Sequence, residues 1–379
     1  MSPVFHESID PTLEFFYHPR TLTCLVVLLA GFLYVALYID PSDDILNTKF
    51  GLAAICSAFA IIGMVLFRDG PFIRPHPAFW RVVLAANVLY EMCLVFLLFQ
   101  SKHTGRSFMA FFDSDLGQEL PERSYGDQCA LTVENVRSGI DIFVLAHSLG
   151  WFGKTLIIRN QTMCWILSVT FELLEYSLAH QLPNFNECWW DHWILGRWCE
   201  YFKMKTYTWH GIREIPSLTG KLSRAGLQFT PHSWTTYEWA PTERFKNFAG
   251  IVMFAVLIML AELNVFYLKS LLWVPPEHPL VIARLALLFL FALPGAREYY
   301  EYYSNPRCKR MGAHCWMLIV TLLSELLIIV KFGRGEFTEP FPTYVIVFWA
   351  CVAAVLVGFS VWRFALKPRL ASKSHAKTE

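Results

Sequence analysis

The sequence predicts an all-α protein, a polytopic transmembrane helix bundle of about nine to ten membrane segments that forms one domain over residues 1–379. Composition is the first observation: 55% of the 379 residues are hydrophobic and only 17% are charged, and the mean hydropathy is +0.38. The second is a series of long apolar runs, because a helix needs roughly 20 mostly apolar residues to cross a bilayer. Both are typical of an integral membrane protein.

Seven apolar runs are candidates for membrane helices. They are residues 21–39, 50–67, 78–100, 248–273, 280–294, 315–331 and 344–366. The central third, 137–202, adds segments near 140–158 and 164–180 and a shorter one near 187–202, each interrupted by ionisable residues. Together these runs give the expected nine or ten segments.

The two ends of the chain are expected on the cytosolic side of the membrane. Residues 1–20 precede the first apolar run, which we interpret as a retained helix because no small-residue cleavage site follows it. The tail, 367–379, carries four Lys or Arg residues, and such basic flanks favour the cytosol.

Two stretches between the runs are polar. Residues 101–135 are expected to form a polar loop on one membrane face. Residues 205–244 are rich in Trp, Tyr, Lys and Arg, a composition that fits an interfacial loop in the headgroup layer or an ordinary solvated loop. The net charge of +1 gives no indication of a nucleic-acid partner.

Carboxylates gather in the apolar, Trp-rich stretch 164–191. A charged side chain in the middle of a bilayer costs about 2.5–3.5 kcal/mol on the mildest scale, so a group of them indicates a functional site. Glu172 and Glu175 are three residues apart and share one helical face. A hard divalent cation with oxygen ligands, Ca²⁺ or Mg²⁺, would relieve their repulsion.

The same pattern continues beyond Pro183, which is expected to end this helix. Asn184 and Glu187 have the spacing of a capping box, so helix capping is one interpretation of them. Glu187 and Asp191 are four apart and share a face, which a hairpin at Pro183 could turn toward Glu172. An oxygen-rich pocket would follow.

Upstream lies the apolar run IFVLAHSLGWFGK, which contains His147 and, seven residues later, Lys154 on the same helical face. His147 is either an interior residue or a general base, since its pKa is ordinarily near neutrality. Lys154 and Arg159 could hold a phosphate, or they could extend to the interface as long cationic side chains do.

The strings QLPNFNECWWDHWIL and FELLEY, with His147 upstream, resemble the eukaryotic base-exchange phosphatidylserine synthases. The resemblance continues through KTYTWHGIREIP, GKLSRAGLQFTPHSW, AELNVFYLK, WVPPEH and SELLIIVKFG, and it is closer to the type that consumes phosphatidylethanolamine than to the type that consumes phosphatidylcholine. It implies a Ca²⁺-dependent exchange of a phospholipid headgroup for L-serine in the endoplasmic reticulum membrane. By position, it implies a catalytic His147 and an essential polar set of Glu172, Glu175, Asn184, Glu187 and Asp191.

The chemistry of the residues agrees with that resemblance. Ca²⁺ held by Glu172, Glu175 and Asp191 would neutralise the phosphodiester. His147 would take the proton of the serine hydroxyl, or would form a covalent phosphatidyl-histidine. Lys154 and Arg159 are candidates for substrate binding. A homodimer is left open.

One departure from the family pattern follows Leu195. The chain is about a dozen residues shorter there, and Gly196 stands where the family has an Asp. The segment is then too short to cross a bilayer at about 1.5 Å per residue. This predicts a catalytically impaired or non-catalytic variant, unless His192 or Glu200 substitutes.

Ionisable residues also occur in the later helices. They are Glu262, Asn264, Arg284, Arg297, Glu298 and Glu325. We expect them to pair within the bundle, with Glu325 and Arg297 as one partnership, or to line the path of serine or the lipid headgroup.

Two other functions match parts of the sequence. An ion-coupled transporter would also carry intramembrane Glu and a Pro-broken helix, but no inverted repeat is visible. Asp69, Gly70 and Arg74 loosely match the start of the CDP-alcohol phosphotransferase motif, whose required downstream Gly and Asp residues are absent.

Overall fold

The computed structural model describes residues 44–72, 76–119, 142–181, 215–227 and 237–369, together with a few residues between 19 and 34. For 142–149 and 224–227 it gives the backbone course only. Every regular element within these ranges is helical, so the all-α prediction is confirmed there. Six helices are long and apolar enough to cross a membrane. The predicted nine to ten segments are not confirmed, and the segment at 187–202 and most of 21–39 lie outside the described residues.

The six candidate membrane helices are α3 (Asp44–Leu66), α4 (Pro77–Leu98), α12 (Phe245–Leu272), α13 (Pro279–Ser304), α14 (Ala313–Phe332) and α15 (Thr343–Val361), the last extended by a π-helical turn, Trp362–Leu366. Four shorter helices are α5 (Lys102–Phe112), α7 (Ile142–Ile158), α8 (Gln161–Leu178) and α11 (Leu218–Leu227). α7 and α8 are 17 and 18 residues long and carry three of the predicted catalytic residues, His147, Glu172 and Glu175.

Two of the membrane helices begin in the same way. His76 precedes Pro77 in α4, and its Nδ1 accepts a hydrogen bond from the Ala78 amide at 3.1 Å. His278 precedes Pro279 in α13, and its Nδ1 accepts from the Leu280 amide at 3.2 Å. A proline in the first turn needs no hydrogen bond of its own, and the imidazole satisfies one of the amides that a helix start leaves free.

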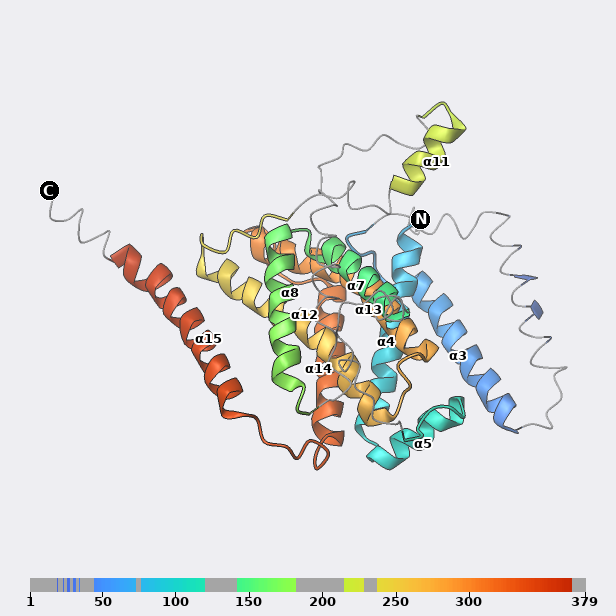
Figure 1. The fold of residues 1–379 in the computed structure, drawn as a ribbon. Coiled ribbons are helices and arrows are strands. Elements are labelled where there is room, and N and C mark those ends of the chain that lie inside the picture. Colours follow the sequence, from blue (N-terminus) through green and yellow to red (C-terminus); the bar gives the residue numbers. More distant parts are fainter. Residues whose placement is uncertain are drawn as a thin grey trace, which may run out of the picture.

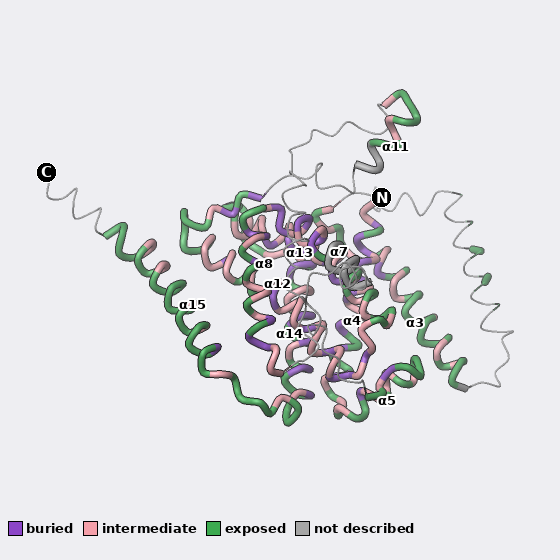
Figure 2. Tube along the Cα trace, viewed as in Figure 1, coloured by how far each residue is buried: buried purple, intermediate pink, exposed green. Residues whose placement is uncertain are grey.

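α14 lies at the centre of the bundle, packed against α4, α12 and α13 (Figure 1). α3 packs on the outer side of α4, α7 packs on α13, and α8 packs on α7 and α12. Buried residues concentrate in this centre, while α3 and α15 are largely exposed (Figure 2). Because their exposed side chains are apolar, the surfaces of α3 and α15 suit lipid contact.

The structure extends α13 beyond Pro294, where the apolar run ended in the sequence. The helix continues to Ser304 with Pro294 inside it. A proline removes one helical hydrogen bond, but here Pro294, Gly295 and Ala296 are buried against neighbouring helices. A Cβ on Gly295 would lie 3.3 Å from the Leu318 side chain, so the two helices approach closely at this turn. Packing therefore outweighs the lost hydrogen bond.

Two predicted loops also contain more structure than expected. Residues 102–112, in the predicted polar loop 101–135, form α5, which is capped by Ser101 and held by Arg106, whose Nε donates to the Leu271 carbonyl at 2.9 Å. In the predicted interfacial loop 205–244, α11 is helical, and Tyr237 and Trp239 are buried in the main core cluster. These two aromatic residues are therefore packed inside the protein and not solvated, and the interfacial position of the loop stays a prediction.

Candidate active site

α7 and α8 form a hairpin with a two-residue turn, Arg159 and Asn160. Arg159 has a positive φ of 49°, which reverses the chain. Asn160 caps α8, its Oδ1 accepting from the Met163 amide at 3.1 Å while its Nδ2 donates to the Tyr237 carbonyl at 3.2 Å. The Tyr237 amide in turn donates to the Arg159 carbonyl at 3.0 Å. The turn is therefore held against the segment 237–240.

Arg159 does not extend to the interface, which was one interpretation of it. Its side chain is buried, Nε donates to the Leu156 carbonyl at 3.1 Å, and the guanidinium lies 4.8 Å from the centre of the Tyr237 ring. Burial raises the pKa of the Tyr237 phenol, so this partner stays neutral at physiological pH. The phosphate-binding role predicted for Arg159 stays a prediction.

Glu172 and Glu175 both lie on α8, as predicted. Glu175 is buried with 7% of its surface exposed, and Glu172 is half-buried. α8, which carries both carboxylates, packs against α7 and α12. Each carboxylate has interactions in the folded chain. Carboxylate oxygens are the ligands that Ca²⁺ prefers.

Lys154 connects these three helices. Its Nζ donates to Glu262 Oε2 of α12 at 3.0 Å and lies 4.3 Å from the centre of the Trp151 ring and 5.2 Å from that of Phe171 on α8. The Lys154 and Glu262 side chains are 17% and 20% exposed, so they form a largely buried ion pair. Phe171 precedes Glu172, so this ion pair lies against the helix that carries the predicted carboxylates.

The rest of the predicted site is only partly described. His147 lies on α7, two helical turns before Lys154, and its backbone alone is described. Asn184, Glu187 and Asp191 lie outside the described residues. Within the described ranges, no three His, Cys, Asp or Glu side chains gather as a metal site would require. Glu172 and Glu175 would therefore need a third ligand from elsewhere, which is the place predicted for Asp191.

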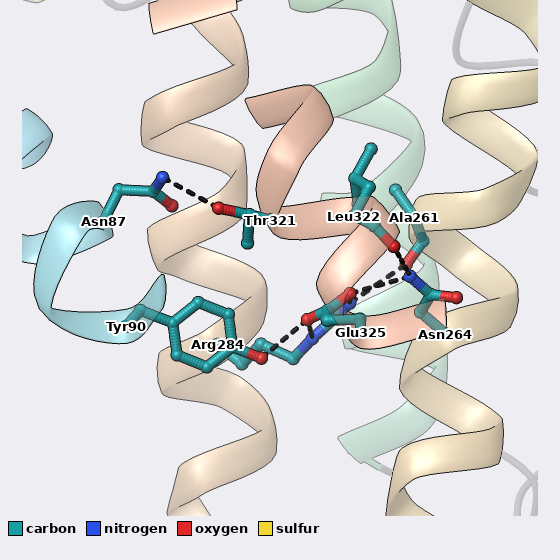
Figure 3. Close-up of polar contacts among 8 residues, drawn as sticks. All are labelled: Asn87, Tyr90, Ala261, Asn264, Arg284, Thr321, Leu322 and Glu325. Atoms are coloured by element: carbon teal, nitrogen blue, oxygen red, sulfur yellow. Dashed lines mark hydrogen bonds and ion pairs between the residues drawn. The ribbon is translucent and has the colours of Figure 1, made fainter. Parts of the chain in front are cut away.

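The neighbouring turn of α12 belongs to a second, deeper polar cluster, the Glu325 network (Figure 3). Glu325 is fully buried, and its Oε1 accepts from Tyr90 Oη at 2.6 Å and from Arg284 Nε at 2.8 Å. Its Oε2 accepts from Arg284 Nη2 at 2.5 Å and from Asn264 Nδ2 at 2.9 Å. Four helices, α4, α12, α13 and α14, thus contribute to one carboxylate.

The two polar clusters meet on α12. Arg284 Nη2 also donates to the Ala261 carbonyl at 3.4 Å, and Asn264 Nδ2 to the Leu322 carbonyl at 3.0 Å. Between Ala261 and Asn264 stands Glu262, the partner of Lys154. One helical turn therefore joins the Glu325 network to the helix pair α7 and α8, and it sets the position of Glu262.

The expected pairing of Glu325 with Arg297 is wrong. Arg297 instead forms an ion pair with Glu301, with Nη2 and Oε1 2.7 Å apart. α13 and α14 are antiparallel neighbours, so the late turns of α13 lie beside the start of α14: Glu298 Oε1 is 3.2 Å from His314 Nδ1, and Glu298 Oε2 accepts from the Cys315 amide at 2.8 Å. Arg284, near the start of α13, is consequently the arginine that reaches Glu325.

Sequence reasoning missed the part that α4 plays. Asn87, Tyr90 and Glu91 follow the i, i+3, i+4 spacing of one helical face, and they meet Thr321, Glu325 and Ser324 of α14, which repeat that spacing. Two polar stripes of equal spacing in apolar helices were the available signal. Of the six residues only Glu325 was singled out from the sequence, because each stripe contains a single acidic residue.

Comparison with known proteins shows which family this chain is similar to. A family model described as phosphatidyl serine synthase matches residues 75–333, which include α4, α7, α8, α12, α13 and α14. Human phosphatidylserine synthase 2 is 42% identical over 381 residues, covering 94% of this chain and 78% of the relative.

Two further relatives have different names from the human protein. CDP-diacylglycerol–serine O-phosphatidyltransferase 2 of Oryza sativa subsp. japonica is 41% identical, covering 95% of this chain and 93% of the relative. Phosphatidylserine synthase 1 of Danio rerio is 37% identical, covering 91% and 78%. These similarities span the helices of the candidate site as well as the residues outside the described ranges.

Proposed function

The chain belongs to the phosphatidylserine synthase family, and from that premise we propose that it makes phosphatidylserine by calcium-dependent base exchange, replacing the ethanolamine headgroup of phosphatidylethanolamine with L-serine. The observation that carries the proposal is the family match over 75–333 together with two carboxylates on the buried side of α8. The chain is a multi-pass membrane protein, which suits a phospholipid substrate. We place it in the endoplasmic reticulum membrane. Family membership favours catalysis over transport.

In this reaction the serine hydroxyl oxygen attacks the phosphorus of the donor phosphodiester. The new bond joins serine to phosphorus, and the bond to the ethanolamine oxygen breaks. His147 would accept the proton of the serine hydroxyl and return it to the departing ethanolamine, a role typically worth about 10²–10⁴-fold in rate. A covalent phosphatidyl-histidine is the alternative route through the same side chain.

The carboxylates of α8 suit a hard cation. Glu172 and Glu175 are one turn apart on a helix whose surroundings are apolar, so their charges need compensation. With Asp191 as third ligand, they would hold Ca²⁺, which when bound supplies positive charge at the phosphate oxygens. The remaining polar residues of the set, Asn184 and Glu187, would orient the ligands and the substrate.

Lys154 is the described cation best placed to assist at the phosphate. Its ammonium already lies between α7, α8 and α12, so it needs no large movement to approach a ligand beside Glu172. A phosphate there would share Lys154 with Glu262. Arg159, which is buried at the hairpin turn, would act on the substrate only from the far end of α8.

The donor lipid is the part of the proposal with a specific rival. The rice relative carries the name CDP-diacylglycerol–serine O-phosphatidyltransferase and is as similar as the animal relatives named phosphatidylserine synthase 2. CDP-diacylglycerol is therefore the second candidate donor, with CMP as the leaving group. Phosphatidylcholine is the third, through the resemblance of the family's two animal types.

The test measures incorporation of labelled L-serine into phosphatidylserine by the purified chain in liposomes. Phosphatidylethanolamine, phosphatidylcholine and CDP-diacylglycerol are supplied in separate reactions, with Ca²⁺ or with a chelator. We expect chelator-sensitive incorporation from phosphatidylethanolamine and release of one ethanolamine per serine. Incorporation from CDP-diacylglycerol alone would replace base exchange by the rival reaction.

The catalytic roles are tested in the same assay. We expect His147→Ala to lower the rate by at least about 10²-fold, while His103→Ala, on the exposed side of α5, leaves it nearly unchanged. Glu172→Gln and Glu175→Gln should raise the Ca²⁺ concentration needed for half-maximal rate, and the exposed Glu339→Gln should not. If these three variants needed the same Ca²⁺ concentration as the unsubstituted chain, Glu172 and Glu175 would not be Ca²⁺ ligands.

The shortened segment after Leu195 supplies the alternative outcome. If the folded chain gives no incorporation from any donor, and restoring a longer Asp-containing segment at Gly196 brings incorporation back, the chain is a non-catalytic variant of the enzyme. Binding of the donor lipid would then separate lost catalysis from lost substrate binding, because a folded non-catalytic variant should retain affinity for the donor lipid.

A further inference from the structure

An apolar groove lies between the end of α8 and the start of α15. Its volume is about 340 Å³. α8 contributes Leu174, Ser177 and Leu178, and the other wall consists of Val345, Ile346 and Trp349 with Phe341 just before α15. The polar atoms in it are satisfied, since Trp349 Nε1 donates to Ser177 Oγ at 2.9 Å and Ser177 Oγ donates to the Leu173 carbonyl at 2.5 Å. The groove therefore offers a hydrocarbon surface.

The groove is next to the predicted catalytic face of α8. Successive residues of an α-helix are rotated by about 100°, so Leu178, three residues after Glu175, points only about 60° away from it. Leu174, which precedes Glu175, points about 100° away on the same side. A molecule with a charged head at Glu175 and an apolar tail could thus lie along one helix without crossing another.

α15 leaves the groove open to the bilayer. It stands apart from the rest of the bundle, and most of its surface is exposed (Figures 1 and 2). Besides the groove, it meets the bundle where Phe359 lies 5.4 Å from Phe248 at the start of α12. Between the two contacts, Val355 and Val357 are 70% and 61% exposed. A lipid tail can therefore enter sideways between α8 and α15.

The end of the groove nearest the end of α8 is polar. His180 follows the lining residues, and its ring packs edge-on against Phe341 with the centroids 5.0 Å apart. Gln181 comes next, and its Oε1 accepts from Tyr267 Oη at 3.1 Å. An apolar groove with polar residues at one end and carboxylates beside it matches the division of a phospholipid into tails and headgroup.

We propose that this groove binds one acyl chain of the donor phospholipid while the headgroup lies against Glu172 and Glu175. The proposal rests on the proposed function, because the donor must be a phospholipid. Lipid tails in a bilayer are already in apolar surroundings, so the groove contributes position more than affinity. Displacing a donor by about 1 Å can cost 10²-fold in rate, so a chain held at this place fixes the phosphodiester relative to the carboxylates.

The test fills the groove and compares donors of different chain length. Ile346 lines the groove and is 57% exposed, so Ile346→Trp fills the groove with little disturbance of the core. Val347 is 55% exposed on the neighbouring face and does not line the groove, which makes Val347→Trp the matched control. The donors are dioleoyl and dihexanoyl phosphatidylethanolamine, each assayed with labelled serine.

We expect Ile346→Trp to lower kcat/KM for the dioleoyl donor by about tenfold, because the headgroup loses its position. The dihexanoyl donor, whose tails are short, should change by less than about twofold, and KM for serine should not change. Val347→Trp should behave like the unsubstituted chain with both donors. Equal losses with the two donors, or equal losses in the two variants, would overturn the proposal.

A second measurement keeps the groove testable if base exchange fails. A phosphatidylethanolamine that carries a photoactivatable diazirine in one acyl tail is crosslinked to the protein in liposomes. The adducts are then mapped by mass spectrometry. We expect adducts at 341–349 that Ile346→Trp removes and Val347→Trp retains. An inactive chain with these adducts would refute the proposed reaction alone, and adducts spread evenly along α15 would refute the groove alone.

Discussion

At the scale of single residues, the ion pair of Lys154 and Glu262 has two separable effects. It compensates two charges that are largely removed from solvent, and it holds an ammonium 5.2 Å from the ring of Phe171, the residue that precedes Glu172 on α8. A structural ion pair and a phosphate ligand make different demands, because the first needs only its partner while the second needs the cation itself. Substitutions of the two partners can therefore separate stability from activity.

We expect Glu262→Gln and Lys154→Met each to lower the free energy of unfolding by about 1–3 kcal/mol, because each leaves a partly buried charge without its partner. The double variant should recover much of that loss. If Lys154 also binds the donor phosphate, activity should stay low in both variants that lack it. Denaturant unfolding in detergent and serine incorporation measure the two effects, and strictly additive stability losses would contradict the pairing.

At the scale of helices, two facing polar stripes specify how α4 lies against α14. Asn87 Nδ2 donates to Thr321 Oγ1 at 3.1 Å, Tyr90 donates to Glu325, and Ser324 Oγ donates to Glu91 Oε1 at 2.6 Å. A shift of one helix by one turn would break all three contacts together. Single hydrogen bonds between membrane helices average only about 0.6 kcal/mol, so the charged member of the set should dominate its energetics.

Glu325→Gln should therefore cost far more than Tyr90→Phe. The first leaves the Arg284 charge without its carboxylate at a fully buried position, which we expect to cost about 3–5 kcal/mol. The second removes one hydrogen bond to that carboxylate and should cost about 1 kcal/mol. Replacing both charges, with Arg284→Met and Glu325→Leu, should cost less than Glu325→Gln alone. Thermal unfolding in nanodiscs measures all three, and similar losses for Gln and Phe would show that the ion pair contributes little.

At the scale of the whole molecule, the charges on the two ends of α12 to α15 are unequal. These four helices cross in alternation, so the start of α12, the connection 305–312 and the end of α15 share one side of the membrane. With the helix ends included, that side carries eight basic residues and two acidic residues: Arg244, Lys246, Arg307, Lys309, Arg310, Arg363, Lys367 and Arg369, with Glu243 and Glu301. The other side, counted in the same way, carries Lys269, Lys331 and Arg334 with Glu277, Glu336 and Glu339. The first side is therefore expected to be cytosolic, in agreement with the predicted cytosolic tail.

This orientation can be measured by thiol labelling in sealed microsomes whose cytosolic face is outward. Cys308, in the connection 305–312, is a partly exposed free thiol and should react with a membrane-impermeant maleimide. Thr338→Cys, introduced with Cys308→Ser, places an exposed thiol in the opposite connection and should react only after permeabilisation. If Thr338→Cys were labelled in intact microsomes, the connection 333–342 would face the cytosol and the orientation expected here would be wrong.

The membrane helices could be predicted from apolar runs, because a helix that is buried or faces lipid along its whole length must be apolar along that length. The pairing of their polar side chains could not be predicted. α13 and α14 are antiparallel neighbours, so Glu325, late in α14, lies beside Arg284, early in α13, and pairs with it instead of with Arg297. α13 continues beyond its apolar run because Pro294 is buried against neighbouring helices. The shared helix of Glu172 and Glu175 could be predicted from their spacing in an apolar stretch, whereas the role of Tyr90 could be seen only once α4 was placed against α14. Asn184, Glu187 and Asp191 stay predictions.

The direction of α8 has a consequence for the fate of the product. Its first turn lies beside Tyr237, which stacks on Tyr300 late in α13, and its end reaches Tyr267 late in α12. The carboxylates near that end are thus closer to the side opposite the basic connections. With the proposed site and the expected orientation, newly made phosphatidylserine would begin in the luminal leaflet, and its arrival in the cytosolic leaflet would depend on a separate protein that moves lipids across the bilayer.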